Sequence, residues 1–235
     1  MNFAQEWSAF WRCFYTNGGY VRVITVGLKN TLTIAVLGLL IGIVIGTLIA
    51  AVRVMPKYKV LPRVLNSICS IYVGFFRGTP IVVQLLLAYY VLFPLMGVSI
   101  GSLNTCILIF GLNSGAYVSE IMRAGIQSVD GGQMEAGRAL GLGFYPTMLK
   151  IVIPQAVKNI LPTMGNEFIA LIKDTSVVSF VAAVDLYKVF TEIGNVNYEY
   201  LAPYLMMALI YIVLIMLISL LFKLLEKQLQ RSERA

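Results

Sequence analysis

The sequence predicts an all-α protein, a polytopic membrane helix bundle of about five transmembrane helices. The first observation is composition: 59% of the 235 residues are hydrophobic and 12% are charged, with a mean hydropathy of +0.83. Soluble domains carry about 25% charged residues. The second observation is two uncharged apolar runs, 30–52 and 201–222. Each is long enough to cross a bilayer, which takes about 20 residues. The third is the placing of basic residues beside the apolar runs, where they set membrane orientation.

Composition also excludes several functions. The chain has no histidine, which excludes histidine-based catalysis, histidine metal sites and histidine pH switches. Its three cysteines, Cys13, Cys69 and Cys106, are too widely spaced for a metal or redox motif. We expect three free thiols, with a Cys13–Cys106 disulfide left open. The net charge of +7 follows from orientation signals and does not indicate nucleic-acid binding.

The N-terminal segment, 1–20, is predicted to be an interfacial helix. It carries aromatic residues at helical spacing: Phe3, Trp7, Phe10, Trp11, Phe14 and Tyr15. Aromatic rings settle at the membrane–water interface. A disordered tail is the alternative. The segment lacks the basic region and small-residue cleavage site of a signal peptide.

The first predicted span covers 21–52, and the segment after it is predicted to be cytoplasmic. Gly38, Gly42 and Gly46 lie four residues apart in the span. Small residues in that register allow close approach of another helix, so we expect packing within the bundle. The positive charges of this segment, which contains no acidic residue, mark it as a cytoplasmic loop. They are Arg53, Lys57, Lys59 and Arg63, with Pro56 and Pro62 expected to break the helix.

The second predicted span is broken, running from 64 to 93 through Arg77-Gly78-Thr79-Pro80. Glycine and proline in a span free backbone groups, which is tolerated only where protein or a cavity satisfies them. The uncharged turn 94–101 should lie outside.

The third and fourth predicted spans, 103–123 and 161–184, carry polar residues at membrane depth. Pro154 and Pro162 are expected to interrupt the approach to the fourth span. Ionisable groups inside a membrane are costly and usually face a pathway or one another. The polar residues of these two spans are Asn113, Ser114, Glu120, Arg123, Asn166, Glu167, Lys173 and Asp174.

The segment 185–200 has three acidic residues and one lysine, and is predicted to lie outside. The fifth span ends at Lys223, and Lys227, Arg231 and Arg234 hold the tail inside. The predicted orientation is therefore N-terminus out and C-terminus in. Five spans make a thin bundle around a pathway, so we expect a dimer.

Between the third and fourth spans lies a polar elbow, 130–154. A helix-forming run, 133–140, carries Glu135 and Arg138, which are spaced as a weakly favourable pair. Gly141 follows where a helix end needs positive φ, and Pro146 suits the start of a second helix. The elbow is expected to be cytoplasmic and of fixed shape.

The elbow resembles the EAA loop of ABC-importer permeases. Glu135-Ala136, then Gly141, then nine residues, then Ile151-Val152-Ile153-Pro154 reproduce its spacing, with Gly137 in place of the second alanine and Ile153 in place of leucine. Three further blocks resemble the polar amino acid subfamily. The first is RGTP followed by IVVQLLLAYY at 77–90, and the other two cover 113–142 and 154–176. The resemblance covers most of the chain from about residue 25 onward.

The resemblance implies a single transmembrane permease domain, 1–235, of the type I ABC importer fold. It implies a multi-pass protein of the bacterial inner membrane and a subunit of an amino acid importer. Partners would be two ABC ATPase subunits, a second permease subunit (the same or related) and an extracytoplasmic amino-acid-binding protein. The chain lacks a Walker A pattern, so ATP and Mg²⁺ would belong to the ATPase, with no cofactor here and no enzymatic activity. Glu135, Ala136, Gly141 and Leu142 would contact the ATPase.

The predicted substrate residues are Glu167, Asn166, Asn113, Ser114 and Asp174. Glu167 and Asn166 would receive an ammonium or a cationic side chain, or else Glu167 caps or pins the helix. Lys173 and Asp174 pair with each other or with a second subunit. Glu120 and Arg123 are a structural pair or a gate. Arg77 holds the helix break open through freed carbonyls, or binds the substrate carboxylate.

Two other classes remain as alternatives. An ion- or proton-coupled secondary amino acid transporter would use Glu167 and Asp174, but no internal repeat supports it. A membrane enzyme is disfavoured, because no nucleophile–base constellation or metal-ligand cluster is visible.

Overall fold

The computed structural model describes residues 2–16, 18–56 and 58–231. Within these ranges all regular secondary structure is helical and there is no strand, as the sequence predicts. Short π-helical turns join several helices, and a 3-10 helix, Thr175–Val181, follows the fourth long one. The helices are α1 Phe3–Thr16, α2 Gly19–Arg22, α3 Lys29–Val54, α4 Val60–Gly78, α5 Ile81–Leu87, α6 Phe93–Leu95, α7 Ser102–Gln127, α8 Gly132–Ala139, α9 Phe144–Thr147, α10 Ile153–Asp174, α11 Leu186–Asn197 and α12 Leu201–Arg231.

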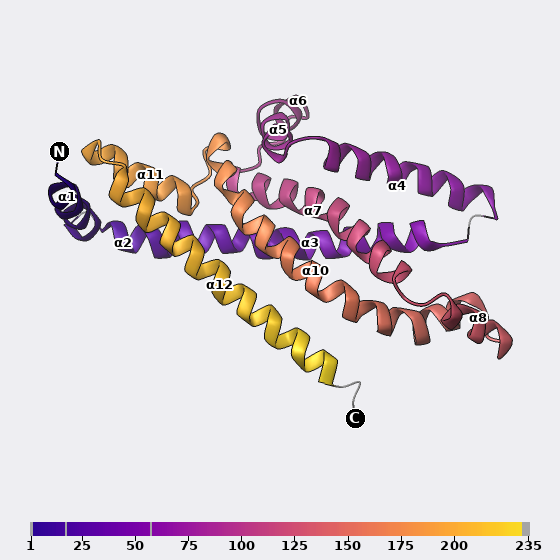
Figure 1. Ribbon diagram of the computed structural model, residues 1–235. Helices are drawn as coiled ribbons and strands as arrows, with labels where there is room; N and C mark the ends of the chain where they lie inside the picture. The colour runs from indigo at the N-terminus through magenta and orange to yellow at the C-terminus, as the bar shows by residue number, and fades with distance from the viewer. Residues whose placement is uncertain (1, 17, 57, 232–235) are drawn as a thin grey trace.

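The molecule is an elongated bundle with two distinct ends. Figure 1 shows α3, α7 and α10 running along its length, with α1 and α11 at one end and α8 at the other. The last turn of α3 and the first turn of α4 lie at the α8 end, which is the end predicted to be cytoplasmic. In the described chain, three helical segments are long and apolar enough to cross a membrane, Gly19–Val54, Ser102–Gln127 and Leu201–Gln228, or four if the bent pair Val60–Gly78 and Ile81–Leu95 forms one span.

The central contact is between α3 and α7, and it depends on glycine. A Cβ on Gly42 would lie 2.7 Å from Ser114 Oγ, and one on Gly46 would lie 2.6 Å from Val118 Cγ1. Atoms at these distances overlap, so only glycine permits the approach. The interface is reciprocal, because Gly111 of α7 faces Ile41 of α3. The predicted packing role of the glycine stripe is confirmed.

The broken second span is sharper than predicted. Helix α4 ends at Gly78, and the helical segment from Ile81 to Leu95 turns from it by 104°. Thr79 and Pro80 between them are extended. Pro62 was expected to break the helix, but it lies in the first turn of α4, where proline is tolerated because that N–H has no helical acceptor.

The fourth span is displaced from its predicted limits. Helix α10 begins at Ile153 and ends at Asp174, and the 3-10 helix follows it. Pro162 lies inside α10 and does not interrupt it. The chain bends out of α10 at Thr175, whose hydroxyl donates to the Ile172 carbonyl at 2.8 Å.

The predicted N-terminal helix is present as α1, and it packs on a helix that the sequence did not predict. Phe10 is buried, and Trp7, Trp11 and Phe14 pack with it against a cluster built on α11 and α12. Helix α11 begins at Leu186, and Asp185 caps it: its carboxylate accepts from the Lys188 and Tyr187 amides at 2.9 and 3.2 Å. An aspartate cap of this kind satisfies orphan donors of the first turn.

Candidate functional site

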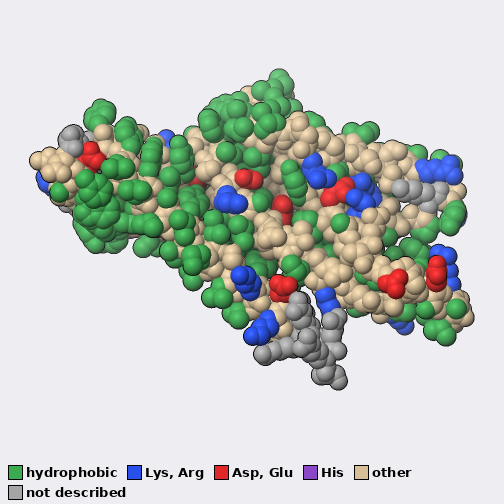
Figure 2. Space-filling view, in the orientation of Figure 1, with side chains coloured by type: hydrophobic (Ala, Val, Ile, Leu, Met, Phe, Trp, Pro, Cys, Tyr) green, Lys and Arg blue, Asp and Glu red, His purple; other side chains and the backbone are tan. Residues whose placement is uncertain are grey.

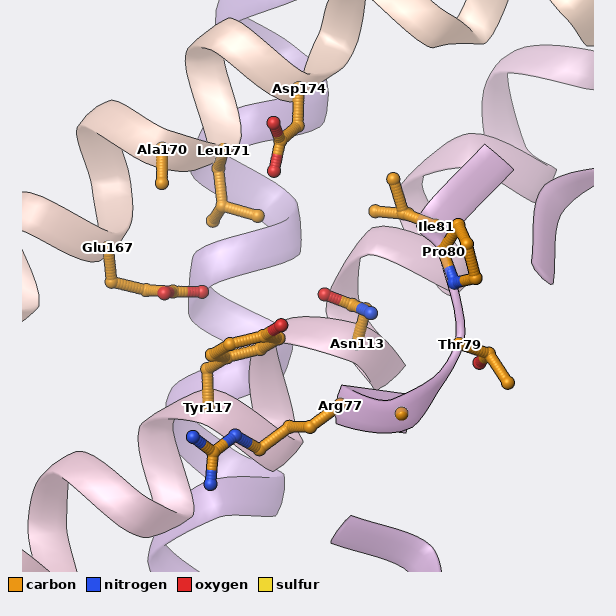
Figure 3. Close-up of a pocket in the computed structure, with 11 residues that line it drawn as sticks. Arg77, Thr79, Pro80, Ile81, Asn113, Tyr117, Glu167, Ala170, Leu171 and Asp174 are labelled. Carbon is orange, nitrogen blue, oxygen red and sulfur yellow. The ribbon is translucent and has the colours of Figure 1, made fainter. Parts of the chain in front are cut away.

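A cavity of about 510 Å³ opens where the bend between α4 and α5 faces α7 and α10 (Figure 3). Its walls come from α4 and α5 on either side of the bend, from α7 and from α10. The residues that line it are Arg77, Gly78, Thr79, Pro80, Ile81, Asn113, Tyr117, Glu167, Ala170, Leu171 and Asp174.

The cavity brings together four of the predicted residues. Asn113 comes from α7, Glu167 and Asp174 come from α10, and Arg77 comes from the end of α4. Glu167 and Asp174 lie seven positions apart, which is two helical turns, so both side chains project from one face of α10. Figure 3 shows both carboxylates directed into the cavity.

The other two predicted substrate residues do not line the cavity. Ser114 is fully buried, and its hydroxyl donates to Glu167 Oε1 at 3.0 Å. Ser114 therefore orients the Glu167 carboxylate from the protein interior, outside the cavity. Asn166 is exposed on another part of α10.

Arg77 makes a contact in the structure that was not predicted. Its guanidinium lies over the Tyr117 ring, 5.3 Å from the centroid, a cation–π arrangement that holds the charge at the cavity wall. Tyr117 was not predicted, because a tyrosine in an apolar span looks like packing. Arg77 forms no described hydrogen bond to the carbonyls freed at the bend. Gln84, also missed, donates to two of them, Phe76 O at 2.9 Å and Thr79 O at 3.0 Å.

Lys173 and Asp174 form no ion pair with each other in the described chain, and both are exposed at the end of α10. The space-filling view shows charged side chains across the middle of one face, over α10 and α7 (Figure 2). Exposed charge at membrane depth is costly unless protein or water covers it.

The pair of Glu120 and Arg123 is confirmed, and it has a third member. Arg123 donates through Nη2 to Glu120 Oε2 at 2.6 Å. Arg53, at the end of α3, pairs with the other carboxylate oxygen. Two arginines on one half-buried carboxylate tie α3 to α7 near the predicted cytoplasmic end. The pair partner Arg53 was missed, because it is remote in sequence.

The elbow folds as helix, turn, helix, as predicted. Helix α8 ends at Ala139, and Gly141 has φ of 77°, which only glycine adopts without strain. The Leu142 amide closes the turn on the Gly137 carbonyl at 2.9 Å. The expected ion pair between Glu135 and Arg138 is absent, although both residues are described.

All four residues predicted to contact the ATPase are exposed on the elbow: Glu135, Ala136, Gly141 and Leu142. Large apolar side chains are exposed with them, including Leu140 at 79% and Tyr145 at 62%. Exposed apolar side chains grouped on a polar segment are typical of an interaction surface.

Comparison with known proteins identifies the family. The family model described as "Binding-protein-dependent transport system inner membrane component" matches residues 38–231. The chain belongs to this family.

Relatives of this transport component agree in length as well as sequence. The arginine transport system permease protein of Bacillus subtilis is 36% identical over 91% of this chain and 95% of its own. The L-cystine transport system permease protein of the same organism is 36% identical over 89% of this chain and 87% of its own. A crystal structure of an amino acid ABC transporter with histidines is 38% identical, with a TM-score of 0.82 over 92% of this chain and 98% of its own.

The transport component is thus a multi-pass inner-membrane protein with the predicted permease fold. One of its two departures from the EAA loop pattern, Gly137, has a structural reason. A Cβ on Gly137 would lie 2.5 Å from Thr147 Cγ2, and Thr147 is fully buried in the closing turn of the elbow. Alanine at this position would force α8 and α9 apart. Glycine leaves the space that the Thr147 side chain fills.

Proposed function

We propose that this permease carries amino acids, and that the cavity beside the 78–80 bend is its substrate site. The observation that carries the proposal is one guanidinium and two carboxylates facing a cavity of about 510 Å³. That volume is within the range of small-ligand pockets, roughly 300–1,000 Å³. The permease relatives named for arginine and L-cystine support amino acids as the substrate class.

The charges suit the two ends of an amino acid. Arg77 offers a fork of donors to the α-carboxylate, and stacking on Tyr117 holds its side chain in place. Glu167 and Asp174 offer acceptors to the α-ammonium or to a cationic side chain. Because two acidic groups face one basic group, the empty cavity favours cations over anions.

We further propose that a second permease subunit covers the charged face of α10. Lys173 and Asp174 are exposed in the single chain, and lipid is an unfavourable environment for both. A second copy, or a related subunit, would cover this face and complete the pathway. An extracytoplasmic binding protein would deliver the amino acid to the α1 and α11 end.

At the other end the elbow would dock on the ATPase, with two ATPase copies serving two permeases. ATP and Mg²⁺ would bind there, so hydrolysis belongs to the partner. Closure of the ATPase pair would move the elbow and switch the bundle between inward- and outward-facing states. The fixed shape of the elbow, held by Gly141 and the Gly137–Thr147 contact, supports its use as a rigid lever.

Uptake by the reconstituted complex tests the proposal directly. The probes are radiolabelled arginine, histidine, cystine and glutamine, with competition by analogues that lack the α-ammonium or the α-carboxylate. At least one amino acid should be taken up in an ATP-dependent manner, and both kinds of analogue should compete poorly. Uptake that survives loss of the ATPase, or that follows a sodium or proton gradient, would favour a secondary transporter instead.

Glu167→Gln is expected to weaken uptake without releasing the ATPase. The substitution keeps the shape of the side chain and removes a charged hydrogen-bond acceptor, which is worth about 1.5–3 kcal/mol, or roughly tenfold or more in KM. Kinetics of uptake and co-purification with the ATPase measure the two effects. Glu6→Gln, at a half-buried position of α1 outside the cavity, is the matched control. Unchanged kinetics in Glu167→Gln would show that Glu167 only pins α10.

A further inference from the structure

The polar groups left at the 104° bend are satisfied mainly by one buried side chain, Gln84. The last turn of a helix leaves carbonyls without helical donors, and Pro80 has no N–H to offer them. Inside a membrane such groups are satisfied only by protein or by water in a cavity. Gln84 Nε2 donates to Phe76 O at 2.9 Å, and at 3.0 Å to the Thr79 carbonyl. It lies 2.9 Å from the Thr79 hydroxyl oxygen as well.

These contacts fix which way the Gln84 amide faces. Its nitrogen meets oxygen acceptors on the bend, and an amide oxygen in the same place would face two carbonyl oxygens. The Gln84 oxygen is therefore turned toward α7, where Asn113 Nδ2 donates to it at 3.0 Å. Gln84 is 5% exposed, so protein encloses the amide.

The orientation of Gln84 in turn fixes Asn113, which lines the cavity. A primary amide has two N–H groups, and those of Asn113 are directed to Gln84 Oε1 and, at 3.2 Å, to Phe76 O. Both donors are thus used on the side of the bend. Figure 3 shows the Asn113 nitrogen toward Thr79 and Pro80, and its oxygen toward the side where Glu167 lies.

We propose that Gln84 is a positioning residue for substrate binding: it holds the Asn113 amide with its oxygen facing the cavity, as a third acceptor beside Glu167 and Asp174. Gln84 does not line the cavity, and it acts on the substrate through Asn113. This inference depends on the cavity being the substrate site. It explains why Asn113, the neutral amide at the site, presents an acceptor and not a donor to an ammonium group.

A double-mutant cycle tests the inference with the assembled complex. The probes are ³H-labelled arginine, histidine and glutamine, each measured for KM and maximal rate of uptake. Gln84→Glu keeps the shape and the acceptor but removes the donors to the bend, Gln84→Met removes both, and Asn113→Ala removes the amide being oriented. Each single variant should raise KM about tenfold, which corresponds to the loss of one hydrogen bond to a charged group. The maximal rate and co-purification with the ATPase should change little.

The combination Gln84→Met with Asn113→Ala decides between positioning and support of the fold. If Gln84 acts through Asn113, the double variant should raise KM no more than Asn113→Ala alone, because coupled residues are not additive. Multiplying effects, or a loss of maximal rate at unchanged KM, would overturn the inference. Gln5→Glu, on the exposed face of α1, is the control for the added charge.

The same measurements separate this inference from the proposed function. If Glu167→Gln and Asn113→Ala both leave KM unchanged, the cavity is not the substrate site and the proposed function fails there. If both raise KM while Gln84→Glu and Gln84→Met do not, the site stands and only the role of Gln84 is wrong. If neither Gln84 variant assembles with the ATPase, Gln84 supports the fold and the inference is overturned.

Discussion

Replacing Glu135 with arginine is expected to abolish transport and ATPase association while leaving the chain inserted in the membrane. Glu135 is exposed in the first turn of α8 and forms no ion pair with Arg138. Within this chain the substitution loses only the favourable placing of an acidic group near a helix N-terminus, about 0.3–1 kcal/mol. A larger effect must therefore arise in the complex, where a reversed charge at a partner contact costs several kcal/mol.

The two readouts of this experiment are co-purification with the ATPase and ATP-dependent uptake, with the membrane fraction as the check on insertion. Glu6→Arg makes the same change at a half-buried position of α1, at the opposite end of the bundle, and should leave co-purification with the ATPase intact. A Glu135→Arg permease that still binds its ATPase and still stimulates ATP hydrolysis would contradict the assignment of the elbow as the ATPase-docking segment.

The second large effect is expected at Gly46, where alanine should strongly destabilise the bundle. The new Cβ would lie 2.6 Å from Val118 Cγ1 and 2.9 Å from the Ser119 amide nitrogen. The second atom is backbone, and Val118 is fully buried, so neither can move aside without shifting α3 from α7. Overpacking of this kind typically costs about 1–3 kcal/mol of folding stability.

Gly74→Ala is a matched control with the opposite expected sign. Gly74 lies inside α4, and a Cβ there would meet nothing within 4 Å. Alanine is favoured over glycine in a helix by about 0.8–1 kcal/mol, so this variant should be slightly more stable. Thermal unfolding of both variants in the same detergent measures the contrast. Equal midpoints for the two variants would show that the α3–α7 approach does not depend on glycine.

The sequence was sufficient for features whose signal is local. The apolar run 30–52, the glycine stripe within it and the turn at Gly141 each depend on neighbours a few residues away. The elbow was predicted for the same reason, because helix ends and turns are set by short-range residue preferences. Glu167 and Asp174 were both predicted as substrate residues, and the cavity brings them together.

What the sequence could not supply is the identity of partners that folding brings together. Gln84 lies in an apolar run and gave no sign that it would reach Phe76, Thr79 and Asn113. Arg53 was read as an orientation signal, but α3 and α7 place it on Glu120. The angle of the bend was equally hidden, since Gly78 and Pro80 permit a break without setting its size.

The polarity of α10 has a consequence for how the protein is made. Among the described helices, those apolar enough to cross a bilayer alone do not include α10. Each acidic or basic residue at the centre of an inserting helix costs about 2.5–3.5 kcal/mol. Helices α3 and α7, which pack against α10, are synthesised before it, whereas α12 follows. Membrane integration of α10 therefore depends on helices already released from the ribosome, and truncated chains that end at Asp174 should integrate this segment only when 29–127 precede it.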